Sequence, residues 1–117
     1  MNKINKIITG TVLLGQNKGT LTGARTANLD TILAKDLNKG LYSCKVILDK
    51  NEYAGLLFFG HNSLSDKDCL EVHILNFDKD IYGKQINIVI NKFLRPEIKF
   101  DNIDDLKKQI KKDLSLI

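Results

Sequence analysis

Alternation of apolar and polar residues at every second position is the feature that most constrains the fold of this 117-residue chain. Residues 69–75 (CLEVHIL) and residues 84–93 (KQINIVINKF) both show it, with isoleucine, leucine or valine at alternate places. A period of two residues is that of a β-strand with one face buried. Two such runs predict a sheet with an apolar side and a polar side.

Further strand-like runs extend this prediction over most of the chain. Residues 6–14 are apolar and β-branched, and the runs 40–48 (GLYSCKVIL) and 52–60 (EYAGLLFFG) flank a polar turn, which predicts a hairpin. Many short strands bounded by turns usually form a sandwich or a small barrel. At this length we expect a single domain over residues 1–117.

The last part of the chain changes period. Ile103, Leu106, Ile110 and Leu114 recur at helical spacing, with acidic residues before them and lysines after them, as the helix dipole prefers. This predicts a helix over about 103–115 that packs its apolar stripe on the barrel. Residues 31–40 are compatible with a short helix or with an irregular crossing.

Charge and cysteine content narrow the classes of partner. The net charge of +4 is mild and comes almost wholly from scattered lysines, which mostly indicate a solvated surface and suit an anionic small ligand better than a nucleic acid. Cys44 and Cys69 are not spaced as in a metal-binding or redox motif. We therefore expect them to be free thiols in a reducing compartment. The apolar run near the N-terminus is short and broken, and no run has membrane-spanning length. We therefore expect a cytoplasmic monomer that binds neither nucleic acid nor membrane.

A glycine-rich stretch, residues 15–29 (GQNKGTLTGARTANL), is the first candidate for a binding site. Glycines let backbone N–H groups approach an anion, and the oxygens of Thr26 and Asn28 are hard ligands suited to Mg²⁺ bound with phosphate. Glycine loops with nearby Thr and Asn more often form plain turns, so this stretch is a weak signal alone.

Two further places carry polar groups that the fold does not require. Glu71 stands in the middle of the strand CLEVHIL, where it either faces water or acts as a general base for an alcohol, with His73 on the same face. Arg95 follows an apolar strand and precedes Phe100, a combination that suits a planar anionic ligand. A surface arginine paired with Glu97 explains this segment equally well.

Taken together, these segments resemble the riboflavin kinases (flavokinases), including the kinase module of bifunctional FAD synthetases. The resemblance runs from Gly10 to about Asp113 and rests on T-A-N after a glycine-rich loop, then LEVHIL, then NFDKDIYGK, then LRPEIKF before the helix. It implies a six-stranded antiparallel Greek-key barrel with a C-terminal helix. It also implies transfer of the γ-phosphoryl of ATP to the 5′-hydroxyl of riboflavin, which gives FMN and ADP.

The resemblance also implies roles for individual residues. Glu71 corresponds to the base for the hydroxyl, and Thr26 and Asn28 correspond to the Mg²⁺ pair. The positions that match the nucleotide side are Gly15, Thr26, Ile74, Asn76 and Tyr82, and those that match the flavin side are Arg95, Ile98 and Phe100.

The chain departs from the family pattern mainly in its first half. Arg25 stands where the family has a proline before T-A-N, and residues 60–68 replace another family stretch. Thr20, Thr22 and Ala24 also differ. These departures leave two alternatives beside the kinase: a degenerate module that binds flavin or nucleotide without turnover, and a barrel kept only for interaction. Without an adenylyltransferase half in this sequence, we do not expect FAD synthesis from it.

Overall fold

Six β-strands make up the described part of the chain. The computed structural model describes residues 3–13, 25–62, 67–77, 79, 81–97, 108–109, 111–112 and 115. The strands are β1 (Lys3–Thr11), β2 (Arg25–Leu29), β3 (Gly40–Leu48), β4 (Asn51–Asn62), β5 (Lys67–Ile74) and β6 (Gln85–Pro96). A short 3₁₀ helix, η2 (Thr31–Ala34), follows β2.

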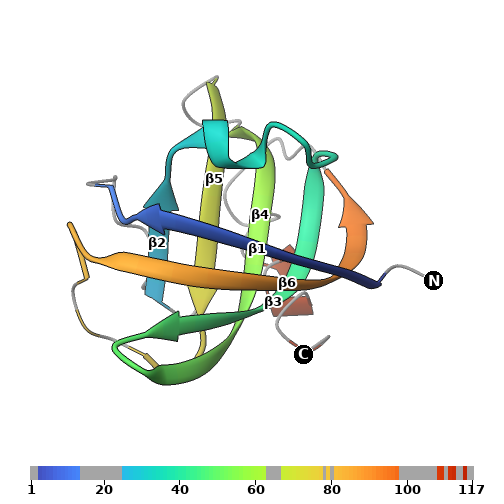
Figure 1. Ribbon diagram of the computed structural model, residues 1–117. Coiled ribbons are helices and arrows are strands. Elements are labelled where there is room, and N and C mark those ends of the chain that lie inside the picture. The colour runs from blue at the N-terminus through green and yellow to red at the C-terminus, as the bar shows by residue number, and fades with distance from the viewer. Residues whose placement is uncertain are drawn as a thin grey trace.

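The strands form one antiparallel sheet in the order β1-β6-β3-β4-β5-β2. Strands β3, β4 and β5 follow one another as hairpins, and β6 returns to lie beside β3, which is the Greek-key arrangement. The sheet curls so that β1 and β6 cross in front of β2, β4 and β5 (Figure 1). Just after β1, the Leu13 N–H donates to the Asn28 carbonyl at 2.7 Å and links the two outer strands. The predicted antiparallel Greek-key fold is confirmed.

The predicted hairpin is the β3–β4 pair. Leu48 pairs with Asn51, so the turn consists of Asp49 and Lys50 alone. Both residues have positive φ, 50° and 70°, as a type I′ turn requires. This turn suits the right-handed twist of the two strands that it joins.

The inner face of the sheet is apolar, as the alternation predicts. The fully buried side chains include Val46, Leu57, Leu70, Val72, Ile74, Ile86, Ile88 and Ile90. The intervening residues of β5 and β6 are half-buried or exposed. Both predicted strand faces are therefore confirmed.

Residues 25–29 differ from the sequence-based expectation, which placed them at the end of a loop. They form strand β2, in which Ala27 and Leu29 turn into the core and the Asn28 side chain lies on the opposite face. Residues 31–40 begin as the 3₁₀ turn η2 and continue irregularly, with the Asp30 carboxylate accepting a hydrogen bond from the Ile32 N–H at 3.0 Å. The segment is thus a short capped turn rather than an α-helix.

Most of the predicted C-terminal helix lies outside the described residues. Lys108, Gln109, Lys111 and Lys112 have helical backbone, but the span 103–115 and its packing stay a prediction. Gly15, Ile98 and Phe100 also lie outside the described residues.

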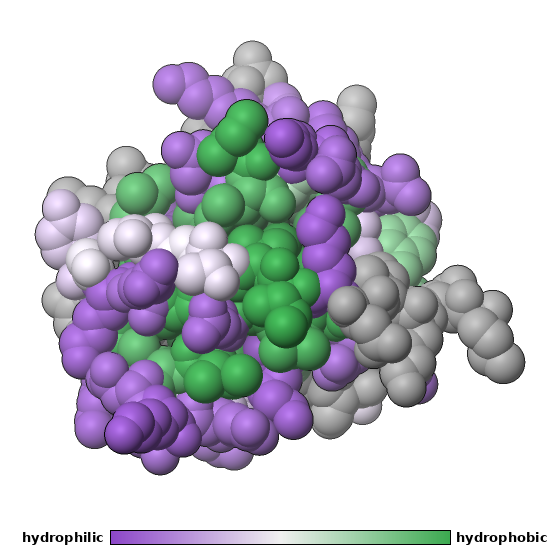
Figure 2. All heavy atoms as spheres, viewed as in Figure 1, coloured by the Kyte–Doolittle hydropathy of each residue, from purple (hydrophilic) through white to green (hydrophobic). Residues whose placement is uncertain are grey.

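The side of the molecule that carries β1 and η2 has exposed apolar residues. Ile7 on β1 and Ile32 on η2 are 64% and 63% exposed. Figure 2 shows apolar atoms gathered at the centre of this side with hydrophilic residues around them. Within the described residues, no helix has the length and apolar character needed to cross a membrane.

Candidate functional site

The T-A-N segment and Glu71 lie side by side because β2 pairs with β5. In this antiparallel pair Asn28 is directly opposite Glu71, and Thr26 is opposite His73. The side chains of Asn28 and Glu71 are half-buried, and each has core-facing neighbours along its own strand. Directly opposite residues have Cβ atoms about 4.5–5.5 Å apart, so the amide and the carboxylate can act on one ligand.

The other neighbour of Glu71 is apolar. Phe58 on β4 pairs with Glu71 on one side and with Leu41 on the other. Leu56, 1% exposed, pairs with His73, and both Leu41 and Leu56 are buried outside the inner core cluster. We call Leu41, Leu56 and Phe58 the outer apolar patch.

This environment explains why the pKa of Glu71 is raised. Burial beside the outer apolar patch raises the pKa of the Glu71 carboxyl above its ordinary value, because the charged form is desolvated. A hydrogen bond with the Cys69 side chain opposes that rise. A carboxylate with a raised pKa accepts a proton more readily near neutral pH, as a general base must.

Cys69 lies two residues before Glu71 on β5, so the two side chains share one face of the sheet. The pKa of the Cys69 thiol is raised to about 12. Burial is the largest cause, and the nearby carboxylates of Glu71, Asp68 and Glu97 add to it. The thiol therefore stays protonated at neutral pH and can donate to Glu71.

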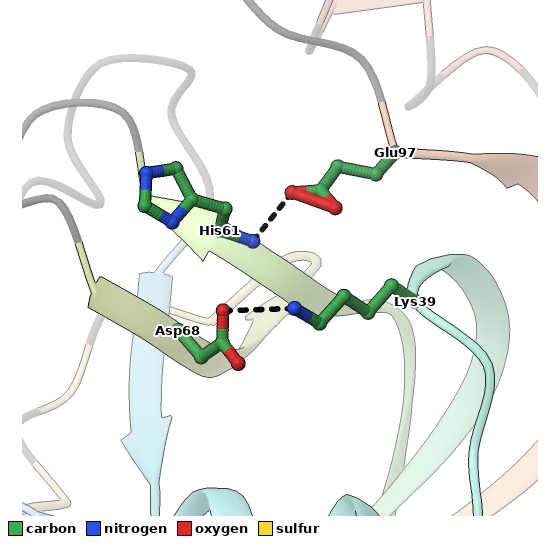
Figure 3. A network of polar contacts seen from close by, with 4 residues as sticks. All are labelled: Lys39, His61, Asp68 and Glu97. Atoms are coloured by element: carbon green, nitrogen blue, oxygen red, sulfur yellow. Dashed lines mark hydrogen bonds and ion pairs between the residues drawn. The ribbon is translucent and has the colours of Figure 1, made fainter.

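The end of β6 reaches the same region. Glu97 Oε1 accepts a hydrogen bond from the His61 N–H at 2.6 Å, and Lys39 Nζ pairs with Asp68 Oδ1 at 3.0 Å beside it (Figure 3). Gly60, the residue before His61 on β4, pairs with Cys69. The contact between Glu97 and β4 therefore brings the end of β6 and Glu97 close to the Cys69–Glu71 face.

Phe58 and Glu97 occupy the space that a side chain at position 60 would need. A Cβ atom at this position would lie 2.8 Å from Phe58 Cζ and 3.1 Å from Glu97 Cδ. Glycine thus allows the phenyl ring and the carboxylate to approach each other above β4.

The remaining predicted residues lie in different surroundings. Arg95 lies within β6 rather than after it, and its Nη1 donates to the Pro96 carbonyl at 3.0 Å. Ile74 has its side chain in the inner core, so only its backbone can meet a ligand. Asn76, with a φ of 55°, and Tyr82, 59% exposed, belong to the connection between β5 and β6.

Sequence reasoning missed Cys69, Gly60 and the role of Glu97. A signal for Cys69 was present, because residues 69 and 71 of an alternating strand share a face. No signal pointed to Gly60 or Glu97, since their proximity depends on β4–β5 register and on the path of β6.

The donors at this face suit a hard cation that is bound together with phosphate. Within the described part of the chain, no group of three or more His, Cys, Asp or Glu residues could hold a metal ion alone. Mg²⁺ is commonly held by one or two protein oxygens, waters and substrate phosphates. The half-buried Asn28 amide opposite Glu71 fits that kind of site.

The fold and the face around Glu71 define a class: a small Greek-key barrel with a half-buried carboxylate between an amide and an apolar patch. The family described as "Flavokinase: Riboflavin kinase" matches residues 3–117. The chain belongs to this riboflavin kinase family.

Individual relatives agree with this assignment. The chain is 42% identical over 109 residues to the "Trifunctional protein RibF/MnmA" of Mycoplasmoides gallisepticum. The alignment covers 89% of this chain and 16% of that protein. It is 33% identical over 114 residues to the "RNA-binding riboflavin kinase RibR" of Bacillus subtilis, covering 95% of this chain and 49% of that protein. The chain thus spans less than half the length of either relative.

A solved structure supports the fold. The riboflavin kinase from Trypanosoma brucei superimposes with a TM-score of 0.61 at 19% identity, over 94% of this chain and 75% of that one. At this level of identity the likeness concerns the fold alone.

Proposed function

We propose that this chain is a riboflavin kinase, which transfers the γ-phosphoryl group of ATP to the 5′-hydroxyl of riboflavin. The observation that carries the proposal is the pairing of Asn28 with Glu71 across β2 and β5, within a barrel of the riboflavin kinase family. The pairing supports the proposal, because phosphoryl transfer to an alcohol needs a proton acceptor close to the ligands of the metal, and Glu71 and Asn28 are directly opposite each other.

Glu71 is the general base in this proposal. Its carboxylate accepts the hydroxyl proton while the ribityl oxygen forms a bond to the γ-phosphorus and the bond to the ADP oxygen breaks. The raised pKa of Glu71, caused by burial, supports the role because it brings the proton affinity of the carboxylate closer to that of a working base.

Asn28 and Thr26 are the proposed protein ligands of Mg²⁺. When bound, Mg²⁺ would neutralise the charge that develops on the phosphate oxygens. Gly15, Asn76, Tyr82 and the backbone of Ile74 are proposed on the nucleotide side. The contribution of the chain is then mainly to hold the phosphates in line with the hydroxyl.

The flavin side is proposed at the end of β6, with Arg95, Ile98 and Phe100. The hydrogen bond from the His61 N–H to Glu97 supports this location, because it holds the end of β6 over β4 near Glu71. β5 lies between β2, which carries Asn28, and β4, which Glu97 contacts, so the nucleotide side and the flavin side are proposed next to each other on this face.

We further propose that the chain acts in the cytoplasm as a monomer, without nucleic acid. The free thiols of Cys44 and Cys69 support a reducing compartment. The scattered lysines support a small anionic partner, although one relative is named RNA-binding.

The test is incubation of the purified chain with riboflavin and Mg-ATP, with FMN and ADP measured by chromatography. We expect FMN and ADP in equal amounts, and none when ATP or Mg²⁺ is left out. Absence of FMN from folded protein that still binds riboflavin would contradict the proposal and favour a binding module without turnover.

A further inference from the structure

One row of paired residues crosses the sheet on the face turned away from the inner core. Asn28 on β2 pairs with Glu71 on β5, and Glu71 pairs with Phe58 on β4. Phe58 pairs with Leu41 on β3, and Leu41 pairs with Arg95 on β6. Directly paired residues of an antiparallel sheet lie on the same face. The row therefore joins the proposed metal ligand and base at one end to the proposed flavin-side arginine at the other.

A β-bulge in β6 brings Arg95 into this row. Tyr42 pairs with Phe93 and Leu41 pairs with Arg95, so Leu94 is an extra residue on β6. Phe93 packs against Tyr42 of the inner core, with ring centroids 5.2 Å apart. In an unbroken strand Arg95, two residues further on, would share the face of Phe93. The bulge instead puts Arg95 on the outer face, opposite Leu41.

Phe58 stands at the centre of the row and is accessible to a ligand. It is half-buried, whereas Leu41 beside it is only 3% exposed. The Phe58 ring extends along β4 over Gly60, since a Cβ atom on Gly60 would lie 2.8 Å from Phe58 Cζ and 3.1 Å from Glu97 Cδ. The Glu97 carboxylate accepts the hydrogen bond from the His61 N–H at this place (Figure 3). The ring is thus a partly exposed aromatic surface with a carboxylate at its far end.

We propose that Phe58 is a substrate-binding residue, which packs its ring against the isoalloxazine of riboflavin and so helps to set where the 5′-hydroxyl meets Glu71. This inference rests on the proposed function, and it adds a residue that belongs to none of the motifs carrying the family resemblance. Isoalloxazine is planar and aromatic. It gains from burial against a phenyl ring and from offset-stacked or edge-to-face contact with it.

The order of chemical types along the row favours isoalloxazine over adenine as the occupant. From Glu71 the row continues in one direction to Phe58 and then to Arg95, and in the other direction to Asn28. Neighbouring strands are about 4.8 Å apart, so Phe58 is one strand spacing from the base. Riboflavin carries the reacting hydroxyl and the ring system on one molecule. The adenine of ATP lies beyond the phosphates, which the proposed function places on the Asn28 side of the base.

Phe58→Leu tests the contact, because leucine removes the ring and keeps an apolar side chain in its place. Phe59→Leu is the matched control. Phe59 is the next residue on β4 and is also half-buried, but it packs against the inner core. Both variants are made in the full chain, and their urea midpoints are compared with that of wild type.

The primary measurement is the dissociation constant of riboflavin, obtained from the change in flavin fluorescence, with Mg-ATP binding measured by calorimetry. We expect Phe58→Leu to weaken riboflavin binding about two- to twelvefold, as loss of one aromatic pair predicts, and to leave Mg-ATP binding unchanged. The KM for riboflavin should rise with little change in the KM for Mg-ATP. Phe59→Leu should leave both affinities unchanged. In the wild-type chain, NMR should show nuclear Overhauser contacts between the isoalloxazine protons and the Phe58 ring.

Several results would overturn the inference. They are equal riboflavin affinity in Phe58→Leu and wild type, an equal loss in Phe59→Leu, and absence of the nuclear Overhauser contacts, which need no variant. Weaker Mg-ATP binding alone in Phe58→Leu would assign the ring to adenine. Lower stability in urea with both affinities unchanged would assign it to packing within the chain.

Binding needs no turnover, so the two proposals can fail separately. Riboflavin bound by the wild-type chain without formation of FMN would refute the kinase and still decide the role of Phe58. Formation of FMN with unchanged riboflavin affinity in Phe58→Leu would refute the role of Phe58 alone. A folded wild-type chain that does not bind riboflavin would refute both.

Discussion

Replacing Glu71 with glutamine tests the proposed base with little change of shape. Glu71 lies between Asn28 on β2 and Phe58 on β4, and glutamine can occupy the same space. Its amide cannot accept the proton of the hydroxyl. Binding of riboflavin and Mg-ATP should therefore stay near normal while the chemical step slows.

The expected loss of turnover is large. A positioned general base contributes about a hundred- to ten-thousand-fold in rate, which corresponds to about 3–5 kcal/mol of activation free energy. The half-buried position of Glu71 reduces competition from water, so we expect at least the lower figure. The assay is FMN formation at saturating riboflavin and Mg-ATP, with binding of each ligand measured by calorimetry.

The same substitution should change how stability depends on pH. Burial raises the pKa of Glu71 in the folded state above its unfolded value. The stabilising contribution of this group is fully present below the unfolded pKa and is lost as pH rises through the folded pKa. Glutamine does not ionise, so Glu71→Gln should gain stability relative to wild type as pH rises from below the ordinary glutamate pKa through the raised pKa of the folded state, measured by urea unfolding.

Glu52→Gln is the matched control, because Glu52 is an exposed carboxylate on β4 that pairs with Lys45. Its turnover should equal that of wild type. Near-normal turnover in Glu71→Gln would refute the role of the base. An unchanged stability difference between low and high pH would refute the argument from burial.

Three further substitutions test the metal ligand, the glycine and the turn. Asn28→Ala should weaken Mg-ATP binding by roughly tenfold, as loss of a contact to a charged group predicts, and should leave riboflavin binding unchanged; calorimetry showing equal Mg-ATP affinity would reject the assignment. Gly60→Ala should lower the free energy of unfolding by about 1 kcal/mol, which is the low end for overpacking because the ends of the Phe58 and Glu97 side chains can move. Unfolding at the wild-type urea midpoint would contradict this. Lys50→Gly should raise the free energy of unfolding by about 0.5 kcal/mol, because the strain energy relieved at the positive φ exceeds the entropy cost of a more flexible unfolded chain. A lower urea midpoint would show that the turn is not strained.

The strand pattern could be predicted from the sequence because it is local. The alternation in residues 69–75 and 84–93 depends only on which residues follow one another, and β5 and β6 bury the predicted faces. The β3–β4 hairpin was predictable for the same reason, since two runs flank a polar turn. The order of the motifs was enough to indicate the family, which the match over residues 3–117 confirms.

Strand β2 could not be predicted in this way. Its described core-facing side chains are Ala27 and Leu29, and it follows a stretch rich in glycine. Pairing with β5 and the bond from Leu13 make this segment a strand, and both partners are distant in the sequence. Tertiary hydrogen bonds here override a weak local preference.

The sequence by itself therefore determined the kind of strands, the hairpin and the types of residue available for chemistry. The tertiary structure decided which of these residues meet. Register places Asn28 opposite Glu71, Phe58 beside it and Gly60 opposite Cys69, while the inner core takes the side chain of Ile74. Register depends on contacts between segments far apart in the chain, and a shift of one residue would move every side chain of β2 or β5 to the other face.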